Sequence, residues 1–434
     1  MARKKPLYVT LAVLGILTVG FGGCPKKQPE VENETANTKS AEEIKYVDHL
    51  TKDGFGIAIN PMASSWEVKQ LETVPEYDTE KDVDTQGVDF RHKDLTKLDL
   101  SKQGELLSHV HFDSMTVWPA ADKLPKGYDP VAIMENSKNP GLGAKGLHKE
   151  GIDGRGVGVA IIDQKLLTTH QEYKDNLKFY EEIYVVDNHE NHADMHGTAV
   201  ASIAVGKTCG VAPGADLYHI ASHAPIAGRE KICSVFARAI NRILEINKKL
   251  QENKIRVISI SLGFNDDLKD ANLLKEKIEQ AEKEGVFVIT SDVWPFKRFN
   301  KDALCRSTTG DADDPSIYSF GSVWDLQSYN SNPSYFKSPT LMIPMSNRTS
   351  ASDSGDANYQ YNTDAGWSWT CPYVAGCYAL ACQVNPDITP ELFWETALKT
   401  GDIMNNTADN TRKDKNNAII INLPKLIKAL QSLG

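Results

Sequence analysis

The chain has 434 residues, of which 41% are hydrophobic and 24% are charged, an ordinary balance for a soluble globular protein. Its length suffices for one large domain with an extension, or for two domains. The formal net charge of −10 argues against nucleic-acid binding as the main role, and no basic block follows the extreme N-terminus. Function must therefore be sought in local patterns.

The N-terminus has the parts of an export signal. Basic residues in MARKK precede a short apolar run, which ends in two glycines before Cys24. The run is short for a membrane span, which needs about 20 residues. This arrangement resembles the bacterial lipoprotein signal, which implies a signal peptide over residues 1–23 and lipidation of Cys24. Phe21 replaces the usual aliphatic residue of that pattern, and an uncleaved anchor is the alternative. Both interpretations place the remaining chain outside the cytoplasm.

The next hundred or so residues are less regular. Residues 24–45 are polar and lack periodicity, which is typical of a flexible tether. Residues 46–145 mix short apolar runs with charged loops, which indicates a region of mixed structure. This region is either a propeptide or an extension packed on the main domain. We expect the main domain to occupy residues 146–434.

From about residue 150, strand and helix patterns alternate. Short, apolar, β-branched runs predict buried strands at 156–163, 179–186, 215–222, 256–263 and 286–291. Helical patterns lie between them, at 196–206, 229–253 and 271–285. The alternation predicts an α/β fold with a mostly parallel sheet and helices on both faces.

The segment GWSWTCPYVAGCYALACQ, residues 366–383, predicts a buried helix that begins near Ser368. Pro372 fits the first turn of a helix, where its missing N–H is not needed. The free N–H groups and partial positive charge of a helix N-terminus suit a nucleophile whose reaction builds an oxyanion. Taken alone, Ser368 is more simply explained as a helix N-cap.

A nucleophilic serine needs a base, and the base needs an orienting carboxylate. Asp163 ends the predicted strand 156–163, at the sheet edge where ligands gather in open parallel sheets. His196 opens the small-residue helix 196–206. Each has a plain structural explanation, as a strand-end turn residue and as a neighbour of a helix cap. Their order with Ser368, however, is that of the subtilisin triad.

Four motifs in the same order resemble those of the subtilisin-like serine proteases, the subtilases. They are AIIDQKL, DMHGTAVASIAVG with GVAPGADLYHI, VISISLG, and GWSWTCPYVAG. The resemblance spans residues 150–400 and leaves out residues 25–145. It implies a subtilisin-like fold and peptide-bond hydrolysis through Asp163, His196 and Ser368, with an acyl-enzyme intermediate.

The resemblance also implies a substrate-binding strand. Ser261, Leu262 and Gly263 of SISLG would present backbone groups to an extended peptide, which would add to them like a strand.

The sequence departs from the family at several positions. Gln164 and Lys165 replace the usual Ser or Thr and Gly after the aspartate. No asparagine stands where the family places its oxyanion donor: Asp292 or Trp294 occupies that neighbourhood, and Asn300 lies a few residues on. Loss of such a donor typically lowers turnover by about a hundred- to a thousandfold. Backbone N–H groups at the serine are the remaining candidates.

We therefore expect an extracytoplasmic serine endopeptidase that acts on peptides or proteins and is held at a bacterial cell membrane by a lipid on Cys24. One alternative is a pseudoprotease scaffold that binds a peptide or a protein partner with little turnover, because the usual asparagine is missing. A second is a transporter's substrate-binding lipoprotein, which would not be expected to show these motifs in triad order.

No cofactor and no metal centre are expected. The acidic run 308–316 leaves a structural calcium ion open, although it lacks EF-hand spacing. Six cysteines besides Cys24 permit disulfides in an exported protein. Three of them, Cys371, Cys377 and Cys382, lie in an apolar segment and are better explained as small core residues.

Overall fold

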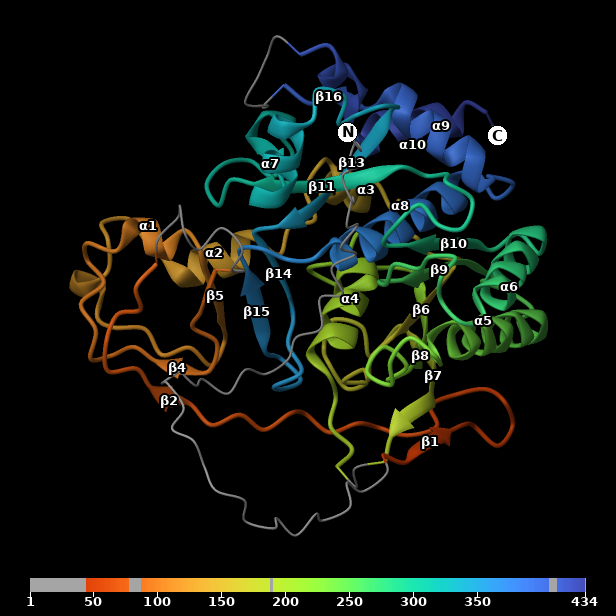
Figure 1. Ribbon diagram of the computed structural model, residues 1–434, viewed down its shortest axis with the longest axis horizontal. Coiled ribbons are helices and arrows are strands. Elements are labelled where there is room, and N and C mark those ends of the chain that lie inside the picture. Colours follow the sequence, from red (N-terminus) through yellow and green to blue (C-terminus); the bar gives the residue numbers. More distant parts are fainter. Residues whose placement is uncertain (1–43, 78–86, 188–189, 406–411, 434) are drawn as a thin grey trace, which may run out of the picture.

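The computed structural model describes residues 44–77, 87–187, 190–405 and 412–433 (Figure 1). The predicted signal peptide, Cys24 and all but the last two residues of the predicted tether lie outside these ranges. Within the described residues, no helix is long and apolar enough to cross a membrane.

A six-stranded sheet forms the centre of the molecule. Its strands lie in the order β1 (Tyr46–His49), β7 (Leu177–Val186), β8 (Asp216–Ala221), β6 (Gly158–Asp163), β9 (Ile255–Ile260) and β10 (Phe287–Thr290). All neighbouring pairs are parallel except β1–β7, which is antiparallel. The five strands predicted between residues 156 and 291 are confirmed as β6 to β10.

Two long helices cover each face of this sheet (Figure 1): α4 (Met195–Val205) and α8 (Thr370–Val384) on one, α5 (Ile232–Lys249) and α6 (Ala271–Lys283) on the other. Successive side chains of a strand point to opposite faces. Accordingly, Val159 and Ile161 of β6 pack with α4 and α8, and Ala160 and Ile162 pack with α5 and α6. Burial on both faces explains why β6 is apolar along nearly its whole length.

A second sheet extends the core beyond α8. Its strands lie in the order β12 (Tyr318–Phe320), β11 (Lys301–Arg306), β13 (Thr340–Ser346), β17 (Ala418–Ile420) and β16 (Asp402–Ile403). A third sheet has the order β14 (Arg348–Ala351), β15 (Tyr359–Asn362), β5 (Val110–Asp113) and β3 (Val88–Asp89). A short parallel pair joins β2 (Lys69–Gln70) to β4 (Lys93–Asp94).

The expectation of a mostly parallel sheet is wrong for the protein as a whole, because the sheets are mixed. In the second sheet both outer strands pair antiparallel with their neighbours. In the third sheet β14–β15 and β15–β5 are antiparallel. Antiparallel strands can follow one another through a short turn, whereas parallel strands need a long crossover. β14 and β15 are such a local pair, whereas β5 joins β15 from about 250 residues earlier in the chain. The strand–helix alternation signalled neither pairing.

The remaining helices are short or peripheral: α1 (Gly104–Leu107), α2 (Pro130–Asn136), α3 (Ala144–Lys149), α7 (Val323–Ser331), α9 (Pro390–Thr400) and α10 (Leu423–Gln431). Among the described residues, four 3₁₀ turns accompany them: η1 (Ala121–Lys123), η2 (Pro315–Ile317), η3 (Trp367–Trp369) and η4 (Asp414–Asn417).

The described part of the N-terminal region contains short strands and short helices. Its two halves lie apart: residues 46–66 run along the central sheet, and the following residues form a small unit beside β14 and β15 (Figure 1). That unit has its own apolar core, made of Phe90, Leu95, Leu98, Leu100, Leu106, Leu107, Val110, Phe112 and Leu124, together with Tyr361 of β15.

Candidate active site

Asp163 is the last residue of β6, between β8 and β9. Its main-chain carbonyl accepts a hydrogen bond from the Ser222 N–H at 2.7 Å, and its Oδ1 accepts one from the Gln164 N–H at 2.8 Å. The side chain is only 5% exposed. A buried strand therefore delivers a fixed carboxylate to the carboxyl edge of the sheet.

His196 is the second residue of α4, and its Nδ1 lies 2.6 Å from Asp163 Oδ1. Because the carboxylate accepts, Nδ1 carries the hydrogen, which leaves Nε2 of the neutral ring as an acceptor. Burial works against the charged imidazolium, but the charges of Asp163 and, more weakly, Asp194 outweigh it and raise the pKa of His196 above its usual value. This pair has the chemistry of an oriented general base.

Two further contacts fix the approach of α4 to β6. A Cβ placed on Gly197 would lie 2.3 Å from the Gln164 carbonyl oxygen, so only glycine allows this distance. The same carbonyl accepts from Nε2 of buried His219 at 2.8 Å, and burial lowers the pKa of His219 to about 4. His219 is thus a neutral donor that holds the loop after Asp163.

A second aspartate–histidine pair lies beside the first. Asp194 Oδ2 accepts from the Lys165 N–H at 3.0 Å and lies 2.9 Å from His223 Nε2. Nδ1 of His223 accepts from the Val186 N–H at 3.0 Å, so the ring hydrogen is on Nε2. Sequence reasoning missed this pair, although Asp194 is only two residues before His196. It fastens the start of α4 to the loop after β6.

Ser368 is the middle residue of η3, which leads directly into α8. The predicted buried helix is confirmed over Thr370–Val384, and the serine sits in the turn before it. Ser261 Oγ donates to the Ser368 carbonyl at 2.7 Å, and Ser368 Oγ donates to the Ser261 carbonyl at 3.3 Å. These two bonds tie the serine turn to the end of β9.

The register of the sheet brings the three predicted catalytic residues to one edge. Ile162 of β6 pairs with Ile260 of β9, so Asp163 and Ser261 follow at neighbouring positions on adjacent strands. The turn η3 also packs against α4, which carries His196. In the described residues the hydroxyl of Ser368 bonds to Ser261 and not to His196. Such bonds are often long in enzymes without substrate.

The predicted substrate strand follows β9 directly. Ser261, Leu262 and Gly263 are partly or fully exposed, and Gly263 is the most open of the three. The Leu262 carbonyl accepts from the Ser291 N–H at 3.1 Å. The main-chain groups of Gly263 have no partner among the described residues. An extended peptide could pair with them as with a strand edge.

Asp292 stands where the oxyanion donor was sought, but both its oxygens accept hydrogen bonds. Oδ2 accepts from the Phe264 N–H at 2.8 Å, and Oδ1 accepts from the Thr290 hydroxyl at 3.1 Å and the Trp294 N–H at 3.3 Å. A Cβ on Gly263 would lie 3.2 Å from Oδ2. Burial raises the pKa of Asp292 above its usual value, although these hydrogen bonds act to lower it. Asp292 therefore acts as a brace for the substrate strand.

The other two candidates for the oxyanion donor are also engaged. Asn300 Nδ2 donates to the Thr340 hydroxyl at 2.6 Å, at the start of β13. Trp294 Nε1 donates to Asp266 Oδ1 at 2.9 Å. Main-chain N–H groups near Ser368 remain the donors that an oxyanion could use.

Three carboxyl groups gather behind the serine turn, and sequence reasoning did not anticipate them. Asp302 accepts from the Tyr335 hydroxyl at 2.9 Å and from the Ala303 N–H at 2.8 Å, and the side chain of Trp367, the residue before the serine, favours its ionised form. Burial, with repulsion from Asp302, raises the pKa of Asp325 to about 8. Burial also raises the pKa of Asp364 to about 6. Because Asp302 accepts more hydrogen bonds than Asp325, we assign the neutral, protonated form to Asp325.

The other predicted features are explained by local structure. Cys371, Cys377 and Cys382 are buried core residues, as expected, and all six cysteines of the described residues are free thiols. In the acidic run, Asp311 Oδ1 and Asp314 Oδ1 accept main-chain N–H groups of their own turns. The described residues contain no group of three or more side chains that could hold a metal ion.

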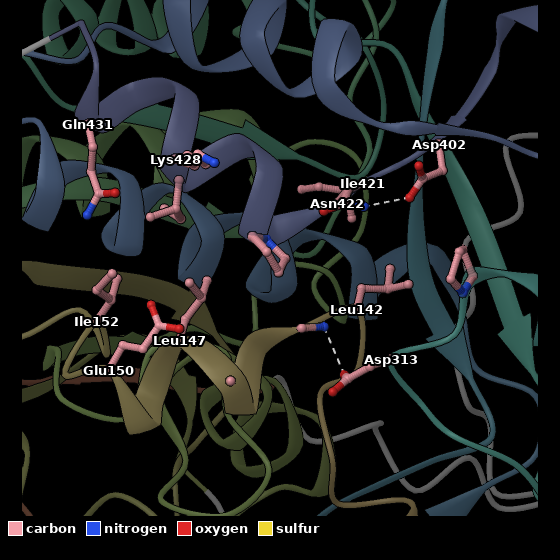
Figure 2. Close-up of a pocket in the computed structure, with 15 residues that line it drawn as sticks. Leu142, Leu147, Glu150, Ile152, Asp313, Asp402, Ile421, Asn422, Lys428 and Gln431 are labelled. Atoms are coloured by element: carbon pink, nitrogen blue, oxygen red, sulfur yellow. Dashed lines mark hydrogen bonds between the residues drawn. The ribbon is translucent and has the colours of Figure 1, made fainter.

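A cavity of about 630 Å³ lies elsewhere, between α3 and α10 (Figure 2). None of the three predicted catalytic residues lines it. Its carboxylates hold the surrounding structure together: Asp313 Oδ1 accepts from the Gly143 N–H at 2.8 Å, and Asp402 Oδ2 accepts from Asn422 at 2.6 Å (Figure 2). The candidate active site is therefore the sheet edge, not this cavity.

Comparison with known proteins gives a family for the part of the chain that holds the aspartate–histidine pair. Residues 154–292 match the model of the subtilase family. This match covers about a third of the chain. The matched range includes Asp163, His196 and Ser261 to Gly263, and it ends before Ser368.

Two curated relatives of this domain come from Bacillus subtilis (strain 168). The chain is 25% identical to the major intracellular serine protease over 268 residues, which are 60% of this chain and 75% of that protein. It is 24% identical to the serine protease AprX over 277 residues, which are 58% of this chain and 62% of that protein. Together with the family match, these relatives confirm the predicted class of enzyme, a subtilisin-like serine endopeptidase.

Solved structures similar to the chain include the patellamide maturation protease PatG, with a TM-score of 0.46 and 15% identity, covering 68% of this chain and 98% of that one. The PatG macrocyclase domain has a TM-score of 0.44 and 14% identity, covering 67% and 95%.

Proposed function

We propose that the subtilase domain hydrolyses peptide bonds through a triad of Asp163, His196 and Ser368. The observation that carries the proposal is the 2.6 Å hydrogen bond between Asp163 and His196, at the sheet edge where Ser261 binds the Ser368 turn. The names of both curated relatives, as serine proteases, support the same chemistry.

The reaction follows from the protonation of the pair. Ser368 Oγ attacks the peptide carbonyl while Nε2 of His196 takes its proton. Asp163 keeps the ring in this tautomer and stabilises the imidazolium. The tetrahedral intermediate then collapses, His196 gives the proton to the leaving amine, and water hydrolyses the acyl-enzyme. For attack, the Ser368 hydroxyl must leave the Ser261 carbonyl and bond to Nε2 of His196.

A fluorophosphonate probe tests this proposal, because it reacts only with an activated serine. We expect the purified chain to be labelled, and Ser368→Ala and His196→Ala to abolish labelling. The matched control is Ser101→Ala, which removes an exposed hydroxyl bound to Asp99. Failure of the wild-type chain to react, under conditions where it is folded, would contradict the triad.

A pseudoprotease is the second candidate, and two observations favour it. The Ser368 hydroxyl bonds to Ser261 instead of His196, and Asp292 accepts hydrogen bonds on both oxygens. The comparison of labelling with turnover separates the two functions. A protease will both react with the probe and release products from a peptide library, with burst kinetics from the acyl-enzyme. A scaffold will bind peptides at residues 261–263 without releasing products.

We further propose that the enzyme is exported and held at a bacterial cell membrane by a lipid on Cys24. The proposal is supported by the basic, apolar and small-residue pattern of residues 1–23. Mass analysis of the membrane-bound protein should find diacylglycerol on Cys24. Cys24→Ala should release the chain or stop its processing, and membrane retention of an unlipidated variant would favour the uncleaved anchor.

A further inference from the structure

The N-terminal region contacts both segments that carry the proposed catalytic residues. We propose that residues 46–136 are retained in the mature enzyme and position His196 and Ser368, and that they are not a propeptide that leaves. This inference rests on the proposed function, and the experiments below are chosen so that the two can fail separately.

On the serine side, the N-terminal region supplies the neighbouring strand. β5 pairs antiparallel with β15, where Tyr361 lies opposite Phe112. Both of these rings are buried, their centroids are 4.8 Å apart, and both belong to the apolar core of the N-terminal unit. The Thr363 hydroxyl donates to the Ser108 carbonyl at 3.0 Å. The chain is thus held by the N-terminal unit until five residues before Ser368.

On the histidine side, the contact is a short stretch of extended main chain. The Met62 N–H donates to the Asn191 carbonyl at 2.7 Å, and the Ala193 N–H donates to the Met62 carbonyl at 2.8 Å. Five residues before Met62, Ile57 forms a parallel β-bridge with Tyr180 of β7. Ala193 is three residues before His196, so this contact lies directly before the start of α4.

Ser64 joins the two sides. Its hydroxyl donates to the Ala193 carbonyl at 2.7 Å, and its N–H donates to the Asp353 carbonyl at 2.8 Å. Asp353 lies in the connection between β14 and β15. One residue of the N-terminal region therefore links the segment before His196 to the hairpin that leads to Ser368.

The first strand of the region completes the central sheet. β1 pairs with the edge strand β7, and Thr51 donates through its N–H and its hydroxyl to Glu181 Oε1 at 2.9 and 2.7 Å. Glu181 has no exposed surface. Release of the region would uncover an edge strand, a buried carboxylate and the apolar face of β15 together.

The state of the labelled enzyme tests retention directly. We would label the full chain with the fluorophosphonate probe and determine the intact mass and the N-terminus of the labelled species. We expect the N-terminus to lie before residue 46. A labelled species that begins after residue 136 would overturn the proposal. Absence of labelling would count against the triad alone, because the N-terminus of the purified chain still reports retention.

Substitution of Ser64 tests the positioning role. We expect Ser64→Ala to lower kcat by about fivefold, the effect of one lost hydrogen bond, with little change in KM or melting temperature. Ser64→Thr, which keeps the hydroxyl, should restore kcat. Ser101→Ala is the matched control within the same region. An unchanged kcat in Ser64→Ala would overturn the role of this bridge.

A nick in the chain tests the whole region. Gly127 lies in an exposed turn with φ of +86° and no neighbouring atoms in its way, so a specific protease site can be inserted there. After cleavage, we expect the two pieces to elute together in native gel filtration and to keep the labelling rate. Separation with loss of labelling would support the positioning role, and separation with labelling intact would overturn it.

Discussion

The substitution Asp325→Asn should make the protein more stable at neutral pH and not at acidic pH. In the folded protein the pKa of Asp325 is raised to about 8, mainly by burial. An unfolded aspartate has a pKa of about 3.9. The folded state thus binds the proton more tightly, and its contribution to stability is complete below pH 4 and falls as the pH rises toward 8.

The size of this effect follows from the difference in pKa. The folded and unfolded pKa values of Asp325 differ by about four units. Between pH 4 and pH 7 the stabilisation falls over about three of these units, and at about 1.36 kcal/mol a unit the loss at pH 7 is about 4 kcal/mol. For a protein of this size, that corresponds to a shift of about 5 °C in melting temperature. The neutral amide of Asn cannot ionise, so Asp325→Asn should escape this loss.

Thermal unfolding of the wild type and of Asp325→Asn between pH 4 and pH 8 measures the difference in melting temperature. Contributions of the other titrating groups cancel in the comparison, because both proteins contain them. Asp122→Asn, at an exposed position, is the matched control and should follow the wild type. A constant difference in melting temperature between Asp325→Asn and the wild type at all pH values would refute the assignment of a buried, protonated carboxyl group.

Three further predictions concern the candidate active site. Asp292→Asn replaces one accepting oxygen by a donor, so it should loosen the substrate strand and lower kcat/KM by about tenfold; a gain in kcat/KM would instead mark residue 292 as the oxyanion donor. Gly197→Ala should displace α4 from the loop after β6 and lower the labelling rate by about a hundredfold, whereas Gly146→Ala, a helical glycine with open space around it, should be harmless; equal rates in both variants would contradict the close approach of α4. Asp194→Asn removes a charge that raises the pKa of His196, so the acid limb of the pH–rate profile should move to lower pH; a shift to higher pH would show that this charge does not act on the base.

The sequence predicted the aspartate–histidine pair because both residues end or begin strongly patterned elements. The apolar run of β6 fixes where the strand stops, and the small residues of α4 fix where the helix can pack. The ends of parallel strands then meet at one edge whatever the loops between them do. These patterns placed Asp163 and His196 at element ends, and the resemblance to the subtilase motifs then joined them as a pair.

The rest depended on contacts that leave no local pattern. The strands β2, β3 and β4 have two residues each, too few to show periodicity. Asp302, Asp325 and Asp364 come from separate parts of the chain, so nothing in the sequence marks them as neighbours. The role of Asp292 is set by which N–H groups face it, and a spacing rule could only name the residue.

The pairing of β1 with β7 and of β5 with β15 has a consequence for folding kinetics. The two N-terminal strands leave the ribosome first, but their partners follow about 140 and 250 residues later in the chain. Such distant pairing raises the contact order, which slows folding and leaves early strands unpaired while the chain grows. Nascent chains of this protein should therefore depend on chaperones that bind exposed strands until synthesis has passed β15.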